Sequence, residues 1–403
     1  MVKFAHMSDV HIGAWRDPKL KDLTVQAFIK AMDLCVEKQV DFILISGDLF
    51  NTALPGIDHL RSVVIQFKRL KEKNLPVYVI PGSHDFSPSG KTMLDVLEEA
   101  GLMINVARVD ATSEGKLVLK FTVDKKTGTK ITGMLGRKGG LEKHYFDDLS
   151  LTPLEVEPGF KIFMFHTALT ELKPKELELM EANPISLLPK NFDYYAGGHV
   201  HIVKTATLEG YRNVVYPGPL FPANFSELEK LERGGFYWFD DGLASYQPVQ
   251  VKNVVKLFVN AEHKSAVEAE AALRAQVDKQ EFVDSIVLVR VEGKLRAGRP
   301  FDINFRDIFA AIYDKGAFFV MKNTVKLVSE EFEEVKVTSS TTEELETKLI
   351  HEHLGQIKVS FQDKEEHFVK ELMRTLSLEK DEGEKKYEYE AKLKKMVDEV
   401  LGV

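Results

Sequence analysis

The chain has 403 residues, 44% of them hydrophobic, and its 54 basic and 62 acidic side chains give a net charge of −8. This hydrophobic share excludes a disordered chain, and the length exceeds what one core usually serves, so we expect two domains and an appendage. Residues 330–403 hold 12 basic and 20 acidic side chains, so the acidity belongs to this segment, and the balanced remainder neither requires nor excludes nucleic acid as a ligand.

Short apolar runs typical of buried strands alternate with amphipathic helical patterns up to about residue 165. The buried strands are expected at Lys3–Met7, Phe42–Ile45, Val77–Ile80, Ile162–Phe165 and Tyr194–Ala196. The helices are expected at Leu23–Lys38, Asp58–Lys73 and Lys91–Ala100. This alternation predicts an α/β fold with a largely parallel sheet and helices on its faces.

Beyond residue 201 the pattern predicts antiparallel strands. Thr205–Leu208 and Asn213–Tyr216 flank Gly210 as in a hairpin, and Gly235–Phe239 and Ser245–Val251 read as further strands. A β-sandwich flanked by helices accommodates both halves of the pattern, with the ligand-binding loops gathered at one rim.

Residues 252–329 predict a second, smaller α/β unit. Its strands are expected at Val254–Val259, Ser285–Val291 and Phe318–Lys326, and its helices at Lys264–Lys279 and Ile303–Tyr313. The unit holds no metal-ligand motif, so we expect it to cap the larger domain and to shape or gate its substrate cleft.

The C-terminal segment is expected to be a linker followed by helices. Residues 330–342 are acidic and rich in Ser and Thr, which is typical of a linker. Residues 343–403 carry three narrow apolar stripes at helical spacing: Leu345, Leu349 and Ile350; Phe368, Leu372, Met373 and Leu376; and Leu393, Met396, Val397, Val400 and Leu401. These stripes are too thin for a core, so we expect them to bind a partner. The alternative is that they fold back on the cap or form a small bundle.

Several features predict a soluble cytoplasmic protein. No apolar run approaches the ~20 residues that a membrane-spanning helix needs. Cys35 is the single cysteine and has no partner for an internal disulfide, which suggests a reducing compartment. Met1 leads directly into an expected strand, so we expect no secretory leader.

Polar motifs follow each of the five expected buried strands. In chain order they supply Asp9 and His11, then Asp48, then Ser83, His84 and Asp85, then His166, and finally His199 and His201. Each motif alone is weak, because short polar pairs after strands often cap helices or form turns. Together, at the carboxyl ends of strands, such carboxylates and imidazoles can hold two divalent cations that clamp the attacking and leaving oxygens of a phosphoryl displacement. The conjunction therefore predicts a dinuclear metal centre.

This set of motifs is the calcineurin-like metallophosphoesterase signature. The whole chain moreover resembles the nuclease subunit of the SMC-like ATPase–nuclease complex that processes DNA double-strand breaks, the meiotic-recombination-eleven/SbcD family, in its archaeal form. The segments that carry this resemblance are Gly47-Asp48-Leu49-Phe50-Asn51, Gly198-His199-Val200-His201 and Tyr216-Pro217-Gly218-Pro219. It implies a metallophosphoesterase domain at 1–251, a capping domain at 252–329, a linker at 330–342 and a partner-binding helical tail at 343–403.

The resemblance also implies roles for the site residues. One Mn²⁺ ion would be held by Asp9, His11 and His201, the other by His166 and His199, with Asp48 bridging the two ions. His84 would stabilise the transition state or protonate the leaving oxygen, and Asp85 would orient His84.

This chain departs from the family pattern at Ser83. The family usually has an asparagine there that binds the second metal, whereas a serine hydroxyl is a shorter and poorer neutral ligand. We therefore expect the second metal to be bound more weakly than the first. At Asn51 some relatives carry a histidine implicated in exonuclease action, and that role does not transfer to this chain.

Contacts with DNA are harder to place from the sequence. The loop Gly136–Gly140 contains Arg137 and Lys138, which are candidates to grip a backbone phosphate, although such a loop is more often a solvated turn. Any DNA binding is expected to be independent of sequence and sensitive to salt.

The resemblance implies a manganese-dependent DNA nuclease, with exonuclease and endonuclease action on double-strand-break ends. Its partners would be DNA ends, a coiled-coil SMC-like ATPase and a second copy of the chain, in a nucleoid-associated location. One alternative is a calcineurin-like phosphatase or small-molecule phosphodiesterase, and another is a catalytically weak scaffold with Ser83 as the mark of decay. The cap and the striped tail favour the nuclease over the first alternative, and the retained His84 and six metal ligands argue against the second.

Overall fold

The structure is a computed structural model that describes residues 2–86, 92–111, 116–137, 143–330, 365–378 and 386–401. The chain divides into two compact units, residues 1–331 and residues 332–403. The first unit contains the sheets and the candidate site, and the second contains two helices, so the two are described separately.

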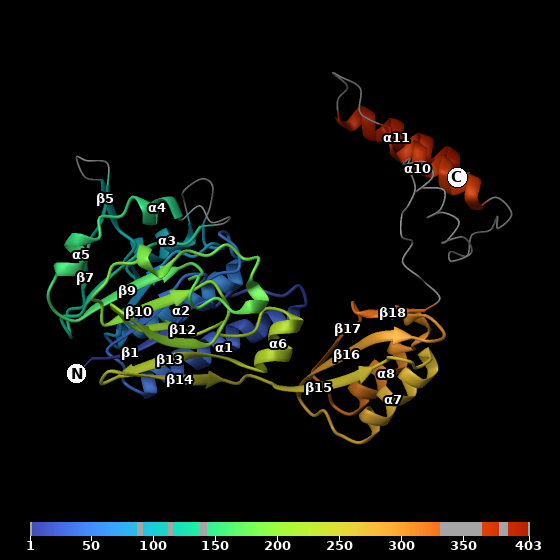
Figure 1. Ribbon diagram of the computed structural model, residues 1–403, viewed down its shortest axis with the longest axis horizontal. Coiled ribbons are helices and arrows are strands. Elements are labelled where there is room, and N and C mark those ends of the chain that lie inside the picture. Colours follow the sequence, from blue (N-terminus) through green and yellow to red (C-terminus); the bar gives the residue numbers. More distant parts are fainter. Residues whose placement is uncertain are drawn as a thin grey trace. The chain divides into compact units, whose positions relative to one another are not determined.

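A six-stranded sheet with the order β14-β13-β1-β2-β3-β4 forms one layer of the large unit (Figure 1). Its strands are β1 (Lys3–Met7), β2 (Phe42–Ser46), β3 (Val77–Ile80), β4 (Ile104–Asn105), β13 (Gly234–Asp240) and β14 (Leu243–Val249). Strands β1 to β4 run parallel to one another. Strand β13 is antiparallel to both of its neighbours, β1 and β14. The connecting helices are α1 (Pro18–Glu37), α2 (Ile57–Glu72) and α3 (Met93–Glu99). The predicted strand–helix alternation is confirmed for this half.

Helix α1 begins at Pro18 and not at the predicted Leu23. The side chain of Asp17 accepts a hydrogen bond from the Lys19 amide at 2.8 Å, which caps the first turn. The fixed φ of Pro18 suits the first helical position. The apolar spacing predicted too late a start, because the helix begins directly after its capping residue. The spacing of apolar residues contains no information about that cap.

A second six-stranded sheet, with the order β11-β12-β10-β9-β8-β7, packs against the first. Its strands are β7 (Thr122–Val123), β8 (Lys130–Gly133), β9 (Lys161–His166), β10 (Tyr194–Gly198), β11 (Lys204–Leu208) and β12 (Tyr211–Tyr216). The predicted hairpin is confirmed as β11–β12, and β12 also pairs in parallel with β10.

Side chains that alternate along each strand build a core on both faces of both sheets. On β1 and β2, Phe4 and Phe42 stack at 5.1 Å in the layer between the sheets, while Ile43 packs towards the helices. On β9, Met164 faces the same inter-sheet layer and Phe165 the opposite side. Strands buried on both faces are continuous apolar runs, which is why these segments could be recognised from the sequence.

Residues 104–133 do not continue the predicted alternation with helices. They form β4 followed by four short strands, of which β5 (Val109–Ala111) and β6 (Leu117–Leu119) make a separate two-stranded sheet. Between β7 and β8, the Asp124 side chain accepts hydrogen bonds from the amides of Lys126 and Thr127 and closes a tight turn. The elements that follow are α4 (Lys143–Asp147), α5 (Thr152–Val156) and the short 3₁₀ turns η2 (Lys175–Leu177) and η3 (Ile185–Leu187).

The large unit also contains a third sheet, built by the predicted cap. Its elements are β15 (Asn253–Asn260), α7 (Ala266–Asp278), β16 (Ser285–Leu295), η4 (Pro300–Asp302), α8 (Phe305–Asp314), β17 (Phe319–Asn323) and β18 (Leu327–Ser329). The single strand predicted at Phe318–Lys326 is wrong, because the Asn323 side chain accepts a hydrogen bond from the Val325 amide at 3.2 Å and turns the chain. Both resulting strands pair in parallel with β16.

The second unit contains α10 (Glu365–Leu376) and α11 (Lys386–Leu401), which contact each other. The Tyr389 hydroxyl donates a hydrogen bond to the Leu378 carbonyl at 2.8 Å between them. The first predicted stripe (Leu345, Leu349 and Ile350) and all of the predicted linker but Glu330 lie outside the described residues. Across the described helices of both units, none is long and apolar enough to cross a membrane.

Candidate metal centre

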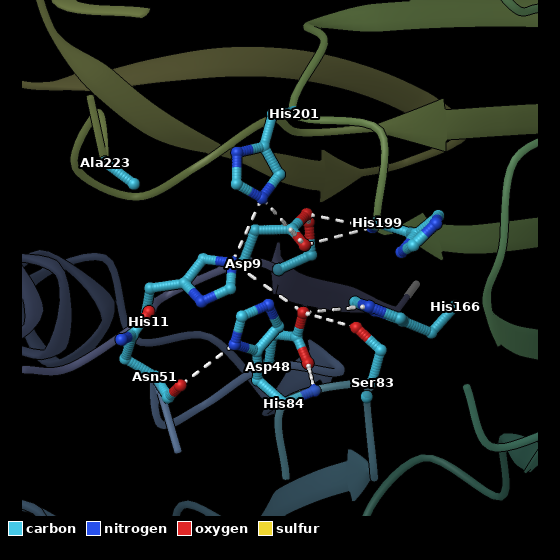
Figure 2. Close-up of polar contacts among 12 residues, drawn as sticks. Asp9, His11, Asp48, Asn51, Ser83, His84, His166, His199, His201 and Ala223 are labelled. Carbon is cyan, nitrogen blue, oxygen red and sulfur yellow. Dashed lines mark hydrogen bonds and ion pairs between the residues drawn. The ribbon is translucent and has the colours of Figure 1, made fainter. Parts of the chain in front are cut away.

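The predicted metal-binding residues gather where five strands of the two large sheets end. Asp9, His11 and Asp48 follow β1 and β2 of the first sheet, and Ser83 and His84 follow β3. The remaining histidines, His166, His199 and His201, come from the ends of β9 and β10 in the second sheet. Figure 2 shows their side chains facing one another across the rim of the sandwich. Every residue predicted as a ligand is therefore present in one cluster.

The backbone of the cluster adopts a conformation that residues other than glycine rarely adopt. The backbone angle φ is positive at five of the candidate ligands: 49° at Asp9, 45° at His11, 52° at Asp48, 95° at His199 and 51° at His201. Such residues persist only where the surrounding structure imposes the strain, and they cluster at functional sites. The geometry therefore indicates that these loops are shaped to aim their side chains.

Two glycines make room for the cluster. Gly47 has a φ of +86°, and a Cβ atom there would lie 2.2 Å from Nδ1 of His166. A Cβ atom on Gly82 would lie 2.3 Å from the carboxylate of Asp48. Any side chain at these positions would displace a candidate ligand, which explains why the sequence has glycine beside these motifs.

One group of donors consists of Asp9, His11 and His201. Their ligand atoms all lie within 4.8 Å of one another. The Nε2 atoms of His11 and His201 are 3.0 Å apart, and Nε2 of His201 is 3.6 Å from the carboxylate of Asp9. The Asp9 carboxylate is held by the Ser8 hydroxyl at 2.6 Å and by the His199 amide at 3.0 and 3.1 Å. Two imidazole nitrogens and a carboxylate converging in this way are suited to a divalent cation.

A second group consists of Asp9, Asp48 and His166, again within 4.8 Å. Nε2 of His166 lies 3.1 Å from Oδ2 of Asp48, and Nδ1 of His166 donates to the Ser46 carbonyl at 2.8 Å. Oδ2 of Asp48 is also 3.7 Å from Nε2 of His11. The Asp48 carboxylate therefore contacts a histidine of each group, and Asp9 is a member of both groups, so both carboxylates have positions that suit a bridging ligand.

Ser83 and His199 lie at the edge of this second group. The Ser83 hydroxyl donates to Oδ2 of Asp48 at 3.4 Å, and Ser83 is 5% exposed. The ring of His199 is 5.2 Å from that of His166, measured between centroids. Both residues are thus close to the candidate second metal position.

Two carboxylates of the site each form a charge pair with a histidine. Burial raises the pKa of Asp48, but His166 outweighs this effect and the pKa falls well below its usual value. Burial lowers the pKa of His166, yet Asp48 raises it to about 10. In the same way Asp9 overcomes burial and raises the pKa of His201 to about 9. Asp48 and Asp9 therefore favour the charged forms of the histidines beside them.

The pKa values of His11 and His199 are lowered and not raised. Burial lowers the pKa of each to about 4, so both rings are neutral at pH 7 and have lone pairs available for a metal. Neutral imidazoles with carboxylates are ligands that suit divalent first-row metals such as manganese and zinc. The donor set therefore fits the metal ions that the sequence predicts.

Comparison with known proteins identifies the family. The calcineurin-like phosphoesterase family matches residues 2–203. The chain belongs to this family. Members of the family bind divalent metals, in agreement with the clustered donors of the phosphoesterase site.

Archaeal proteins named DNA double-strand break repair protein Mre11 are similar to this phosphoesterase. The protein from Archaeoglobus fulgidus is 28% identical over 58% of this chain and 53% of its own length. The protein from Sulfurisphaera tokodaii is 25% identical over 93% of this chain and 97% of its length, and that from Methanocaldococcus jannaschii is 27% identical over 82% and 83%. The expected resemblance is confirmed, although the chain spans only 53% to 63% of the length of several of these relatives.

His84 and Asp85 have different surroundings in the phosphoesterase site. Nδ1 of His84 contacts the Asn51 carbonyl at 2.9 Å, and the His84 amide donates to Asp48 at 2.7 Å. His84 also forms a third group of possible metal donors with His11 and Asp48. The described hydrogen bonds therefore assign the orientation of the His84 ring to Asn51 and not to Asp85.

Asp85 binds backbone atoms of two loops. Its carboxylate accepts hydrogen bonds from the amides of Leu49 at 3.2 Å, Phe50 at 3.1 Å and Gly82 at 3.1 Å. Burial raises the pKa of Asp85 to about 6, with a further contribution from the negative charge of Asp48. Asp85 thus fastens the loop after β2 to the loop after β3.

The sequence analysis missed Glu227, which contacts a candidate ligand. Oε1 of Glu227 accepts a hydrogen bond from Nδ1 of His201 at 2.9 Å. Glu227 lies on α6 (Phe225–Leu231), a helix capped by the Asn224 side chain. The pattern of Asn224 followed three residues later by a glutamate is a helix-start signal that could have revealed this helix.

Arg137 lies beside the site, between two aromatic rings. Its guanidinium carbon is 4.7 Å from the ring centroid of Phe86 and 4.9 Å from that of Tyr145. Its Nε atom is buried and has no hydrogen-bond partner among the described residues. The neighbouring Gly136 packs against His166, since a Cβ atom there would meet its ring at 2.6 Å. Lys138, the other predicted DNA contact, lies outside the described residues.

Proposed function

We propose that this phosphoesterase is a manganese-dependent DNA nuclease that hydrolyses phosphodiester bonds at double-strand-break ends. The observation that carries the proposal is the position of Asp48, whose Oδ2 atom lies 3.1 Å from His166 on the second sheet and 3.7 Å from His11 on the first. The similarity to archaeal proteins named for double-strand-break repair supports DNA as the substrate. Exonuclease and endonuclease action, a homodimer and a cytoplasmic, nucleoid-associated location are part of the same proposal.

In this proposal the chain holds two Mn²⁺ ions. Asp9, His11 and His201 bind one ion, and His166, His199 and more weakly Ser83 bind the other. Asp48 contacts both. When bound, such ions act as Lewis acids and neutralise the charge that develops on the phosphoryl oxygens.

His84 supplies the proton chemistry in this proposal. Because the Asn51 carbonyl can only accept a hydrogen bond, Nδ1 of His84 carries the hydrogen, which leaves Nε2 as the nitrogen for contact with a substrate oxygen. The ring lies 4.8 Å from that of His11, measured between centroids, and is therefore beside the metal donors. We assign to His84 the transfer of a proton to the leaving oxygen.

Arg137 is proposed to grip a backbone phosphate next to the scissile bond. The rings of Phe86 and Tyr145 hold its guanidinium plane, which lowers the entropy that the side chain would lose on binding. Because Nε is buried, the terminal nitrogens of the guanidinium are the donors that this proposal assigns to a phosphate oxygen. Such a contact positions the strand without reading its sequence.

Metal binding is expected to release protons, because His166 and His201 must lose the protons that their raised pKa values hold at pH 7. We expect release of about two protons per chain, one from each histidine. As the pH falls below about 9, the affinity for manganese should drop roughly tenfold per pH unit for each proton that must be displaced. Calorimetry in buffers of different ionisation enthalpy measures this release. Binding without proton release would contradict the assignment of these two ligands.

Ser83 is expected to leave the second metal loosely bound. Substitution Ser83→Asn supplies an amide oxygen that reaches further than the hydroxyl, so we expect the manganese concentration for half-maximal activity to fall. Manganese titration of activity and of binding measures the change. If the asparagine variant binds manganese more weakly, Ser83 is a ligand adapted to this site and the prediction is wrong.

The tail is expected to bind the coiled-coil ATPase, since the apolar residues of α10 and α11 remain partly exposed, with Met373 and Leu376 at 39% and 54%. Truncation after Glu330 removes no proposed ligand, so manganese-dependent cleavage of short single strands should persist. Association with the ATPase and ATP-dependent processing of duplex ends should be lost. Size-exclusion chromatography of the truncated chain with the ATPase measures this, and co-elution would require the docking assignment to be withdrawn.

The function itself is tested by incubating the full chain with linear DNA and manganese, beside p-nitrophenyl phosphate as a small substrate. We expect the DNA to be degraded, with EDTA abolishing the reaction. Hydrolysis of p-nitrophenyl phosphate with intact DNA would instead support the phosphatase alternative. No hydrolysis of either substrate would support the scaffold.

A further inference from the structure

Helix α6 contacts the metal site through Glu227. The carboxylate of Glu227 is fixed by three hydrogen bonds, from Nδ1 of His201 at 2.9 Å, from the Ala223 amide at 2.8 Å and from the Asn224 side chain at 2.6 Å. Figure 2 shows Ala223 on the same side of the site as His201. Because Nδ1 of His201 donates to Glu227, Nε2 is the nitrogen that faces Asp9 and His11, the other donors of the first group.

The same helix is bound to the cap sheet. Glu229 of α6 forms a two-pronged ion pair with Arg290 of β16, with both nitrogen–oxygen distances at 2.6 Å. The side chains of Arg290 and Glu229 are 17% and 28% exposed, so the pair is largely shielded from water. Lys256 of β15 also contacts the Glu229 carbonyl at 3.2 Å and the Glu232 carboxylate at 2.5 Å.

Packing links these two sets of contacts. Leu228, between the two glutamates in sequence, is fully buried in the core next to the first sheet. The Arg290 guanidinium also lies over the ring of Phe225, at 5.3 Å from the centroid, at the start of the helix. Because α6 has only seven residues, a displacement at one glutamate moves the other.

We propose that Glu227 is a positioning residue for His201 and that the Arg290–Glu229 pair sets its position, so that the cap sheet and the metal site are energetically coupled through α6. The inference rests on the proposed metal-binding role of His201. A carboxylate that binds the outer nitrogen of a ligating histidine fixes the tautomer and orientation of the ring, and its loss typically weakens metal binding. A shift of α6 therefore changes the affinity of the first metal.

The positioning role is tested by measuring how the full chain binds manganese. Calorimetry and electron paramagnetic resonance of the free ion both measure this binding. Glu227→Ala is expected to weaken the binding of one of the two ions by about 10- to 100-fold. Glu227→Gln should fall between Ala and the wild type, because the amide oxygen can still accept a hydrogen bond from His201. Thermal unfolding in EDTA checks that each variant is folded.

Coupling to the cap is tested by combining substitutions. Arg290→Ala should weaken the same ion by about 3- to 10-fold in the wild-type chain and leave it unchanged in the Glu227→Ala chain. Arg290→Lys keeps the positive charge but cannot form both hydrogen bonds to Glu229, so it should weaken manganese binding less than Arg290→Ala does. Arg296→Ala is the control, because it removes another arginine–glutamate pair of the cap, in which one guanidinium nitrogen contacts both oxygens of Glu268, and it should leave binding unchanged.

Each outcome has a distinct meaning. Wild-type affinity in Glu227→Ala would overturn the positioning role. An equal loss from Arg290→Ala in both backgrounds, no loss in either, or a matching loss from Arg296→Ala would overturn the coupling. A wild-type chain that binds a single manganese ion, whose affinity falls in Glu227→Ala, would contradict the proposed function and not this inference. A wild-type chain that binds no manganese would overturn both.

Discussion

Substitution Asp48→Ala is expected to abolish tight binding of the metal pair and all cleavage of DNA, while the fold survives. Two divalent cations about 4 Å apart repel by roughly 16 kcal/mol at an effective dielectric constant of 20. The Asp48 carboxylate is the anion placed to offset this repulsion, because it lies 3.1 Å from Nε2 of His166 and 3.7 Å from Nε2 of His11. Manganese titration by calorimetry measures the loss.

Asp124→Ala provides the matched control for this prediction. Asp124 is as buried as Asp48, at 1% exposed, and accepts a hydrogen bond from the Tyr78 hydroxyl at 2.9 Å, outside the metal cluster. Its removal should lower stability by about 1–3 kcal/mol, the range for a buried hydrogen-bond partner left unsatisfied, with metal binding retained. If the Asp48→Ala chain still binds two manganese ions, Asp48 is not the bridging ligand.

Substitution His84→Ser should lower the rate of DNA cleavage by about 10²- to 10⁴-fold, the usual scale for loss of a general acid. Bound manganese should stay the same, because the proposed ligand sets of both ions are complete without His84. Single-turnover cleavage and metal analysis of the same preparation separate the two effects. His144→Ser, which changes an exposed histidine on α4, should alter neither quantity.

The geometry makes this a strict test. His84 lies within 4.8 Å of donor atoms of His11 and Asp48, so it also has the position of a possible ligand. A parallel loss of manganese and of activity in His84→Ser would move His84 from proton transfer to metal binding.

The sequence predicted best those parts of the molecule in which side-chain burial dictates the backbone. Strands such as β2 and β9 are buried on both faces, so they appear as continuous apolar runs, and the polar residues at their ends had to meet at one rim. Asp48 and His166 could be placed in one cluster for this reason. The cap strand after α8 could not be predicted correctly, because a side-chain hydrogen bond at Asn323 turns the chain within the predicted segment.

Other parts of the site depend on contacts that leave little trace in a sequence. The ring of His84 is oriented by the backbone carbonyl of Asn51, an atom that every residue has. Asp85 follows His84 in the chain but binds backbone amides of two loops, since the turn directs its side chain inward. Glu227 reaches His201 from a helix 26 residues further along the chain, and only the fold brings the two together.

Anomalous X-ray scattering from crystals of the full chain grown with manganese tests whether two metal ions share Asp48. We expect two peaks about 4 Å apart. One should contact Asp9, His11 and His201, and the weaker one His166 and His199, with Asp48 in contact with both. A single peak at saturating manganese, or two peaks of which Asp48 contacts one alone, would contradict the account.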